Sequence, residues 1–161
     1  MLPAAVFLAL LAASPAAALS CLTPNAGETF NELAEAEATY YIGVGTFAVP
    51  AGAQGLPEDQ TATAKLRFEG ELFSRLDTVP FEGLVEVTVT CLDMWCGPDP
   101  TSETDQLVFL EAIDDDTMAL EEGPCPYRIL SAPTAPQRVA LFECMEAGLC
   151  RDDQIDLFDR K

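Results

Sequence analysis

The sequence predicts a mainly β fold: a small five-stranded barrel with a short N-terminal helix and a C-terminal helix, stabilised by disulfides. Three observations predict it. Several short segments alternate apolar and polar residues, which is the pattern of strands with one buried face. Helical periodicity occurs only before and after these segments. The chain also combines an apolar leader with six cysteines, which is typical of disulfide-stabilised exported domains.

Residues 1–20 have the composition of a secretory signal peptide. They carry no charged side chain, and the apolar run 4–13 is too short to cross a bilayer as a helix. Small residues follow this run, so cleavage is expected after Ala18 or after Ser20. We therefore expect a mature chain, residues 21–161, that forms a single domain, is secreted or periplasmic, and has no membrane-spanning segment.

An N-terminal helix is predicted over residues 27–37. Asn25 and Glu28 have the spacing of an N-cap followed by a carboxylate three residues later. Phe30 and Leu33 then recur at helical spacing, which gives the helix one apolar face.

Five segments have the alternation or the β-branched and aromatic content of strands. They are residues 40–49, 65–72, 85–91, 107–113 and 117–120. Glycines in the first segment are expected to bend it so that the sheet can close into a barrel. The turn at Asp114, Asp115 and Asp116 is expected to make the last two segments a hairpin. A count of five strands favours an OB-type barrel.

A C-terminal helix is predicted from a capping box at Thr134 and Gln137, with Gly148 at the expected C-cap. An apolar face between these signals would pack on the sheet. The residues from Arg151 onward are predicted to be a polar, acidic tail.

All of the cysteines follow the leader: Cys21, Cys91, Cys96, Cys125, Cys144 and Cys150. An even number in an exported chain predicts up to three disulfides. We favour Cys91–Cys96, Cys144–Cys150 and Cys21–Cys125, and the alternative is Cys21–Cys96 with Cys91–Cys125. The absence of CxxC spacing and of histidine disfavours structural zinc. Cys21 has a further interpretation, as the lipidated first residue of a lipoprotein.

Charge and composition exclude several function classes. The chain has 8 Lys plus Arg, 27 Asp plus Glu, no histidine and a net charge of −19. A nucleic-acid partner is not expected, because it requires a basic patch. Nucleophiles activated by histidine are also excluded. No metal or cofactor is predicted, since neither Asp114–Asp116 nor the acidic tail has the ligand spacing of a calcium loop. The charge favours a partner with a basic surface.

Two residues are candidates for a functional role. Trp95, the only tryptophan, lies between Cys91 and Cys96. An aromatic ring held by a small disulfide loop would suit a partner contact, and the alternative is that it packs over the barrel end. Glu111 interrupts the apolar segment 107–113; we expect it to face outward at a sheet edge. A small carboxylate-dependent hydrolase is a third, competing hypothesis.

The order of these features resembles the netrin/TIMP-like OB fold, including its bacterial exported relatives. The resemblance rests on Cys21 before a short helix, the aromatic and glycine-rich first strand, Cys96-Gly97 after the third strand, and Gly123-Pro124-Cys125 after the hairpin. It covers residues 21–125 and implies a five-stranded barrel.

The resemblance also implies an activity. In this family the amino group and carbonyl of an N-terminal cysteine chelate the zinc of a metalloprotease, a role that only Cys21 matches here, after cleavage behind Ser20. The chain departs from the animal pattern at two positions. Thr23 stands where the animal proteins have a second cysteine, and Leu22 stands where they have a small hydroxylated residue. We expect a non-catalytic binding domain that uses Cys21, Leu22 and Trp95 to contact an exported protein, and the resemblance implies an inhibitor-like role for it. A lipid-anchored envelope protein of the same fold is the alternative.

Overall fold

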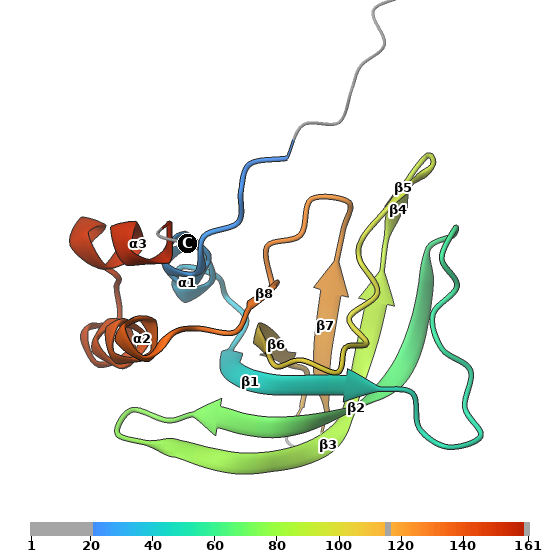
Figure 1. Ribbon diagram of the computed structural model, residues 1–161, viewed down its shortest axis with the longest axis horizontal. Coiled ribbons are helices and arrows are strands. Elements are labelled where there is room, and N and C mark those ends of the chain that lie inside the picture. Colours follow the sequence, from blue (N-terminus) through green and yellow to red (C-terminus); the bar gives the residue numbers. More distant parts are fainter. Residues whose placement is uncertain (1–20, 115–116, 160–161) are drawn as a thin grey trace, which may run out of the picture.

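The computed structural model describes residues 21–114 and 117–159. The expected signal peptide and the predicted turn residues Asp115 and Asp116 lie outside these ranges. The described chain forms a β-barrel with a group of helices on one side (Figure 1). Its main strands are β1 (Tyr40–Ala48), β2 (Ala62–Phe73), β3 (Thr78–Val89), β6 (Gln106–Ala112) and β7 (Met118–Glu122).

These five strands close the barrel that the sequence predicts. The sheet order is β1-β2-β3-β7-β6, and β1 pairs with β6 to complete the ring. All neighbours are antiparallel except β3 and β7, which are parallel. This is a five-stranded, OB-like closed barrel. The predicted hairpin is also present, because β6 and β7 pair through Glu111↔Ala119 and Ala112↔Met118.

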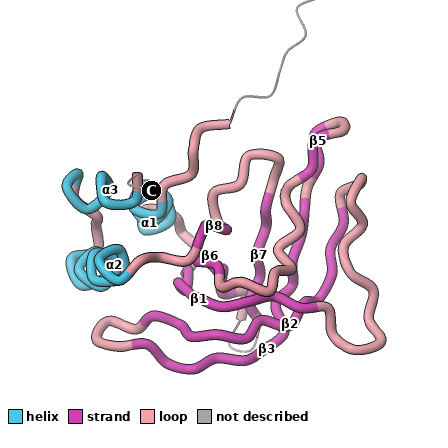
Figure 2. The backbone as a smooth tube through the Cα atoms, viewed as in Figure 1, coloured by secondary structure: helices cyan, strands magenta, loops and turns pink. Residues whose placement is uncertain are grey.

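Three short strands are additions to the barrel. β4 (Cys91–Leu92) and β5 (Trp95–Cys96) form a separate two-stranded hairpin after β3. β8 (Ile129–Ser131) pairs with β6 and stands at the edge of the main sheet. Figure 2 shows β8 leading from the barrel towards the helices.

Alternation along the strands fills the barrel interior, as β2 illustrates. Leu66 and Phe68 are fully buried, while Arg67 and Glu69 are exposed. Phe47 of β1 packs on Phe68 with a distance of 5.0 Å between ring centroids. The inward face of each strand thus supplies the apolar surface whose burial stabilises the barrel.

Strand β6 is apolar on both faces because it lies between the barrel interior and the helices. Val108 and Leu110 belong to the interior cluster, whereas Leu107 and Phe109 belong to a second cluster under the helices. This double burial explains the continuous apolar run that the sequence shows at this strand.

Glu111 does not lie at a sheet edge, contrary to the expectation from sequence. Barrel closure gives β6 a neighbour on each side, with Tyr40 opposite Glu111 on β1 and Ala119 opposite it on β7. The Tyr40 hydroxyl donates to the Glu111 carboxylate at 3.2 Å, and Arg128 Nη1 lies 3.8 Å from the same oxygen. Glu111 is therefore a half-buried, paired carboxylate.

The helices α1 (Ala26–Ala34), α2 (Ala135–Ala147) and α3 (Asp152–Phe158) pack together beside the barrel (Figure 1). The first begins at the predicted cap, where the Asn25 side chain accepts from the N–H groups of Gly27 and Glu28. Their apolar residues join the second cluster, together with Ile42 and Val44 of β1.

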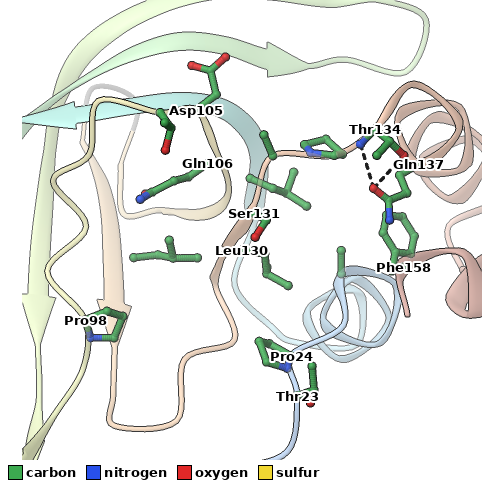
Figure 3. Close-up of a pocket in the computed structure, with 16 residues that line it drawn as sticks. Thr23, Pro24, Pro98, Asp105, Gln106, Leu130, Ser131, Thr134, Gln137 and Phe158 are labelled. Carbon is green, nitrogen blue, oxygen red and sulfur yellow. Dashed lines mark hydrogen bonds between the residues drawn. The ribbon is translucent and has the colours of Figure 1, made fainter. Parts of the chain in front are cut away.

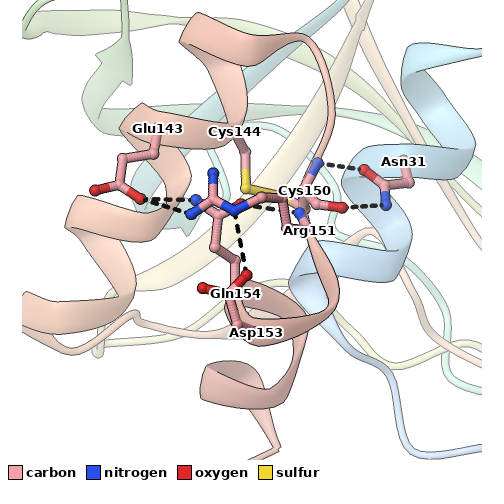
Figure 4. A network of polar contacts seen from close by, with 7 residues as sticks. All are labelled: Asn31, Glu143, Cys144, Cys150, Arg151, Asp153 and Gln154. Carbon is pink, nitrogen blue, oxygen red and sulfur yellow. Dashed lines mark hydrogen bonds and ion pairs between the residues drawn. A yellow bond between two sulfur atoms is a disulfide. The ribbon is translucent and has the colours of Figure 1, made fainter.

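The prediction of a polar tail after Arg151 is wrong, because residues 152–158 form α3. Its side chain Gln154 is buried and donates to the Glu143 carboxylate at 2.8 Å. Asn31 of α1 exchanges hydrogen bonds of 2.9 and 2.7 Å with the backbone of Cys150 (Figure 4). These buried polar contacts tie an otherwise acidic segment to the fold.

Three disulfides join Cys21 to Cys125, Cys91 to Cys96 and Cys144 to Cys150. They are the pairings that we favoured from the sequence. Three disulfides in a domain of this size fit an extracellular or periplasmic compartment. Within the described ranges, no helix is long and apolar enough to span a membrane.

The close approach of β1 and β2 gives a testable prediction. Gly45 faces Gly70 across these strands, and a Cβ at Gly70 would lie 2.2 Å from the carbonyl oxygen of Val44. Gly70→Ala should lower the free energy of unfolding by about 2 kcal/mol or more, because backbone must move to relieve the clash. Urea denaturation measures this. Thr46→Ala, on the same strand pair, is the control, and an equal loss in both variants would contradict the argument.

Candidate functional site

The hairpin β4–β5 projects from one end of the barrel (Figure 1). Its strands are joined by the Cys91–Cys96 disulfide, and Leu92 pairs with Trp95. The two-residue turn begins at Asp93, whose φ of 60° lies in the left-handed region that aspartate tolerates better than most residues. The loop between the two cysteines is therefore a short, covalently closed hairpin.

Three apolar side chains at this turn face solvent. The exposed fractions are 62% for Leu92, 83% for Met94 and 54% for Trp95. We call these three residues the hairpin tip. Trp95 is more than half exposed, so it does not bury its ring over the barrel end, which was one of the two interpretations that the sequence allowed. Adjacent exposed apolar side chains of this size are typical of contact surfaces.

The base of the hairpin is fixed to the end of β7. Thr90 donates its N–H to the carbonyl of Glu122 at 2.8 Å, and Gly97 donates to the carbonyl of Thr90 at 3.0 Å. A Cβ at Gly97 would lie 2.7 Å from the Glu122 carbonyl oxygen. Only glycine permits this approach, so the Cys96-Gly97 pair of the sequence has a packing role.

Cys21 and Leu22 lie at the same end of the barrel. The disulfide from Cys21 reaches Cys125, which follows the Glu122–Gly123 segment that supports the hairpin. Figure 1 shows the start of the described chain and the hairpin projecting from this end. Leu22 is 92% exposed. The structure thus brings all three predicted contact residues, Cys21, Leu22 and Trp95, to one end of the molecule.

Cys21 cannot serve two of its predicted roles at once. A sulfur bonded to Cys125 has no free valence for a thioether-linked lipid. Its backbone nitrogen and carbonyl take no part in the disulfide.

Glu122 is the residue at this end that sequence reasoning missed. It is fully buried, although it ends β7 beside an exposed glutamate. Its carboxylate accepts the N–H groups of Tyr127 at 2.7 Å and of Arg128 at 3.2 Å. The alternation of β7, in which Leu120 and Glu122 share the inward face, was the signal that could have revealed it.

Burial raises the pKa of Glu122 from 4.5 to about 7, and the backbone N–H groups of the loop oppose that rise. The carboxylate therefore titrates near neutral pH. Because it holds the backbone at Tyr127 and Arg128, it organises the loop that carries Cys125 and so supports the position of Cys21.

Arg128 belongs to a neighbouring cluster. Its guanidinium lies 5.2 Å from the ring centroids of Tyr40 and Tyr127, and it donates to the Tyr40 hydroxyl at 3.2 Å. Together with Glu111, these residues form a half-buried charged and aromatic group between β1, β6 and the loop after β7. Such contacts stabilise a local arrangement.

The acidic clusters do not assemble a metal site in the described chain. No group of three or more potential ligands of the types His, Cys, Asp or Glu occurs within residues 21–114 and 117–159. Asp152, Asp153 and Asp156 are placed on α3, and Asp159 is its C-cap.

Comparisons with protein-family models, with curated proteins and with solved structures find no match to this chain.

The buried carboxylate makes stability depend on pH. The folded state binds the Glu122 proton more tightly than the unfolded chain does, so the free energy of unfolding should fall as pH rises from about 4.5 to about 7. The stabilisation amounts to about 3 kcal/mol. It is fully present below the unfolded-state pKa of 4.5 and is lost above the folded-state pKa of about 7. Urea denaturation at a series of pH values from about 4.5 to 8 measures this change in the free energy of unfolding.

Glu122→Gln should remove this part of the pH dependence, because glutamine does not ionise. Glu121→Gln, at the exposed neighbouring position, should leave it intact. An unchanged slope in Glu122→Gln would show that another group is responsible.

Proposed function

We propose that this chain is an exported, non-catalytic binding domain that contacts a partner protein through the hairpin tip and Leu22. The observation that carries the proposal is the exposure of Leu92, Met94 and Trp95 on a hairpin that is held by a disulfide and by backbone hydrogen bonds at its base. A contact that is already ordered loses little conformational entropy on binding. A tryptophan and a methionine are also residue types enriched in interfaces.

The charge of the chain supports a partner with a basic surface. Most of the described arginines already pair with carboxylates of the same chain, as in Arg67 with Glu82, Arg138 with Glu71 and Arg151 with Asp153. The net charge of −19 shows that acidic side chains greatly outnumber basic ones in the chain. A partner with an apolar pocket rimmed by lysine and arginine would complement both the hairpin tip and the negative charge of the chain.

An inhibitor-like mode is the form of this proposal that the TIMP-like resemblance supports. If processing places Cys21 first, its amino group stands beside Leu22 at the same end as the hairpin tip. The partner in that case is an exported metalloenzyme. Lipid anchoring of Cys21 is the alternative, and it requires Cys125 to be unpaired.

The contact surface can be tested by affinity capture from periplasmic and culture fractions, with the oxidised mature protein immobilised. Trp95→Ala should weaken retention of a specific partner about 30-fold, the effect of losing a central interface residue. Leu76→Ala is the matched control, because Leu76 is 94% exposed in the turn between β2 and β3. Retention should also fall as salt rises.

Two results would count against this proposal. If Trp95→Ala leaves retention unchanged but lowers the melting temperature, the ring has a packing role. If the intact mass of the purified protein includes an acyl-glyceryl group on Cys21, the lipid-anchored alternative is correct.

A further inference from the structure

A cleft of about 730 Å³ runs beside strand β8 (Figure 3). Its walls come from four parts of the chain: the segment before α1 with Pro24, the loop before β6 with Pro98, β8 with its continuation to the start of α2, and Phe158 of α3. This volume is within the range of sites that hold several residues or a small molecule.

The backbone of β8 has one side without a strand partner. Phe109 N–H donates to the carbonyl of Arg128 at 3.0 Å, so in the alternating ladder Leu130 also directs its backbone groups to β6. Ser131 directs its N–H and C=O to the opposite side. In the described chain no other strand pairs with β8, and Ser131 itself lines the cleft. The cleft therefore follows the open edge of a sheet.

One residue of the cleft wall also has a buried polar atom without a partner. Gln106 lies opposite Ser131 in the β6–β8 register and lines the same cleft. Its Oε1 is buried and forms no hydrogen bond within the described residues. Because buried acceptors are nearly always satisfied, a turn of the Gln106 amide towards the cleft would let an N–H donor of a bound molecule satisfy this oxygen.

The other residues that line the cleft determine the polarity and charge of the molecule that it can bind. Leu130, Pro24 and Phe158 give apolar surface, whereas Asp105 is the only charged residue among the described residues of the lining. With a net charge of −19 on the chain, a basic group is favoured at Asp105 and an acidic one is repelled.

We propose that this cleft binds an extended peptide segment of a partner protein, which adds a strand to the free edge of β8. The segment pairs with the N–H and C=O of Ser131, places an apolar side chain against Leu130 and Phe158, and places a lysine or arginine at Asp105. Strand addition derives affinity from the backbone and specificity from alternate side chains. This is a second site, separate from the hairpin tip.

NMR titration of the ¹⁵N-labelled oxidised protein tests the proposal. The probe is the peptide acetyl-Lys-Val-Thr-Val-Lys-amide, with two matched copies. One copy is N-methylated at its three central residues, and the other has glutamate in place of lysine. The parent peptide should shift the amides of Gln106 and Ser131 and slow hydrogen exchange at Ser131. The N-methylated copy should bind at least about tenfold more weakly, because it loses its backbone donors.

Variants of the protein distinguish backbone pairing at Ser131 from other causes of peptide binding. Ser131→Pro removes the outward N–H at an edge position where proline is tolerated, and Ser131→Ala keeps it. Binding should fall only in the proline variant. If that variant does not fold, the N-methylated peptide carries the test on the native chain. Asp105→Asn should reduce the preference for lysine over glutamate about threefold.

Trp95→Ala should leave peptide binding unchanged, so the hairpin tip and this cleft can fail independently. Equal binding of the parent and N-methylated peptides would overturn the proposal, as would the absence of any shift at Ser131 with about millimolar peptide. Shifts at Ser131 that appear on concentrating the protein alone would also overturn it, by identifying a second copy of the chain as the occupant.

Discussion

Pairing of β1 with β6 is the constraint from which most of the structure follows. It converts a sheet with two edges into a closed ring, so each of the five main strands has a paired neighbour on both sides along part of its length. It also places β6 between the interior and the helices, which is why Leu107 and Phe109 are as deeply buried as Val108 and Leu110. Glu111 is drawn into a cluster with Tyr40 and Arg128 for the same reason.

Closure leaves irregular structure at the ends of the strands, and the distinctive features of the molecule occur there. The hairpin β4–β5 and the loop carrying Cys125 both depend on the last residues of β7. Glu122 connects them: its carbonyl accepts from Thr90, while its carboxylate holds Tyr127. One buried residue thus sets the relative position of two surface segments, at the cost of burying an ionisable group.

The sequence predicted what depends on local pattern. Alternation at Leu66 and Phe68, the cap at Asn25 and the two short-range disulfides, Cys91–Cys96 and Cys144–Cys150, all agree with the structure. It did not predict what depends on distant partners. α3 is acidic and gains stability from Asn25, which lies 130 residues from Ile155 and donates to its carbonyl. Three-residue β8 exists only because β6 is there to pair with it. Nor could composition show that Trp95 would face solvent, since exposure is a property of the assembled hairpin.

The Cys21–Cys125 disulfide encloses most of the barrel, because its two ends are 104 residues apart in sequence. Exposed loops such as residues 50–60 are where proteolytic cleavage starts. A single cut in this loop divides the chain but leaves both fragments joined through the disulfide. The strand pairs on either side of the cut remain within one covalent molecule. A cut that would release a fragment from the reduced chain therefore leaves the two fragments covalently joined in the oxidised chain.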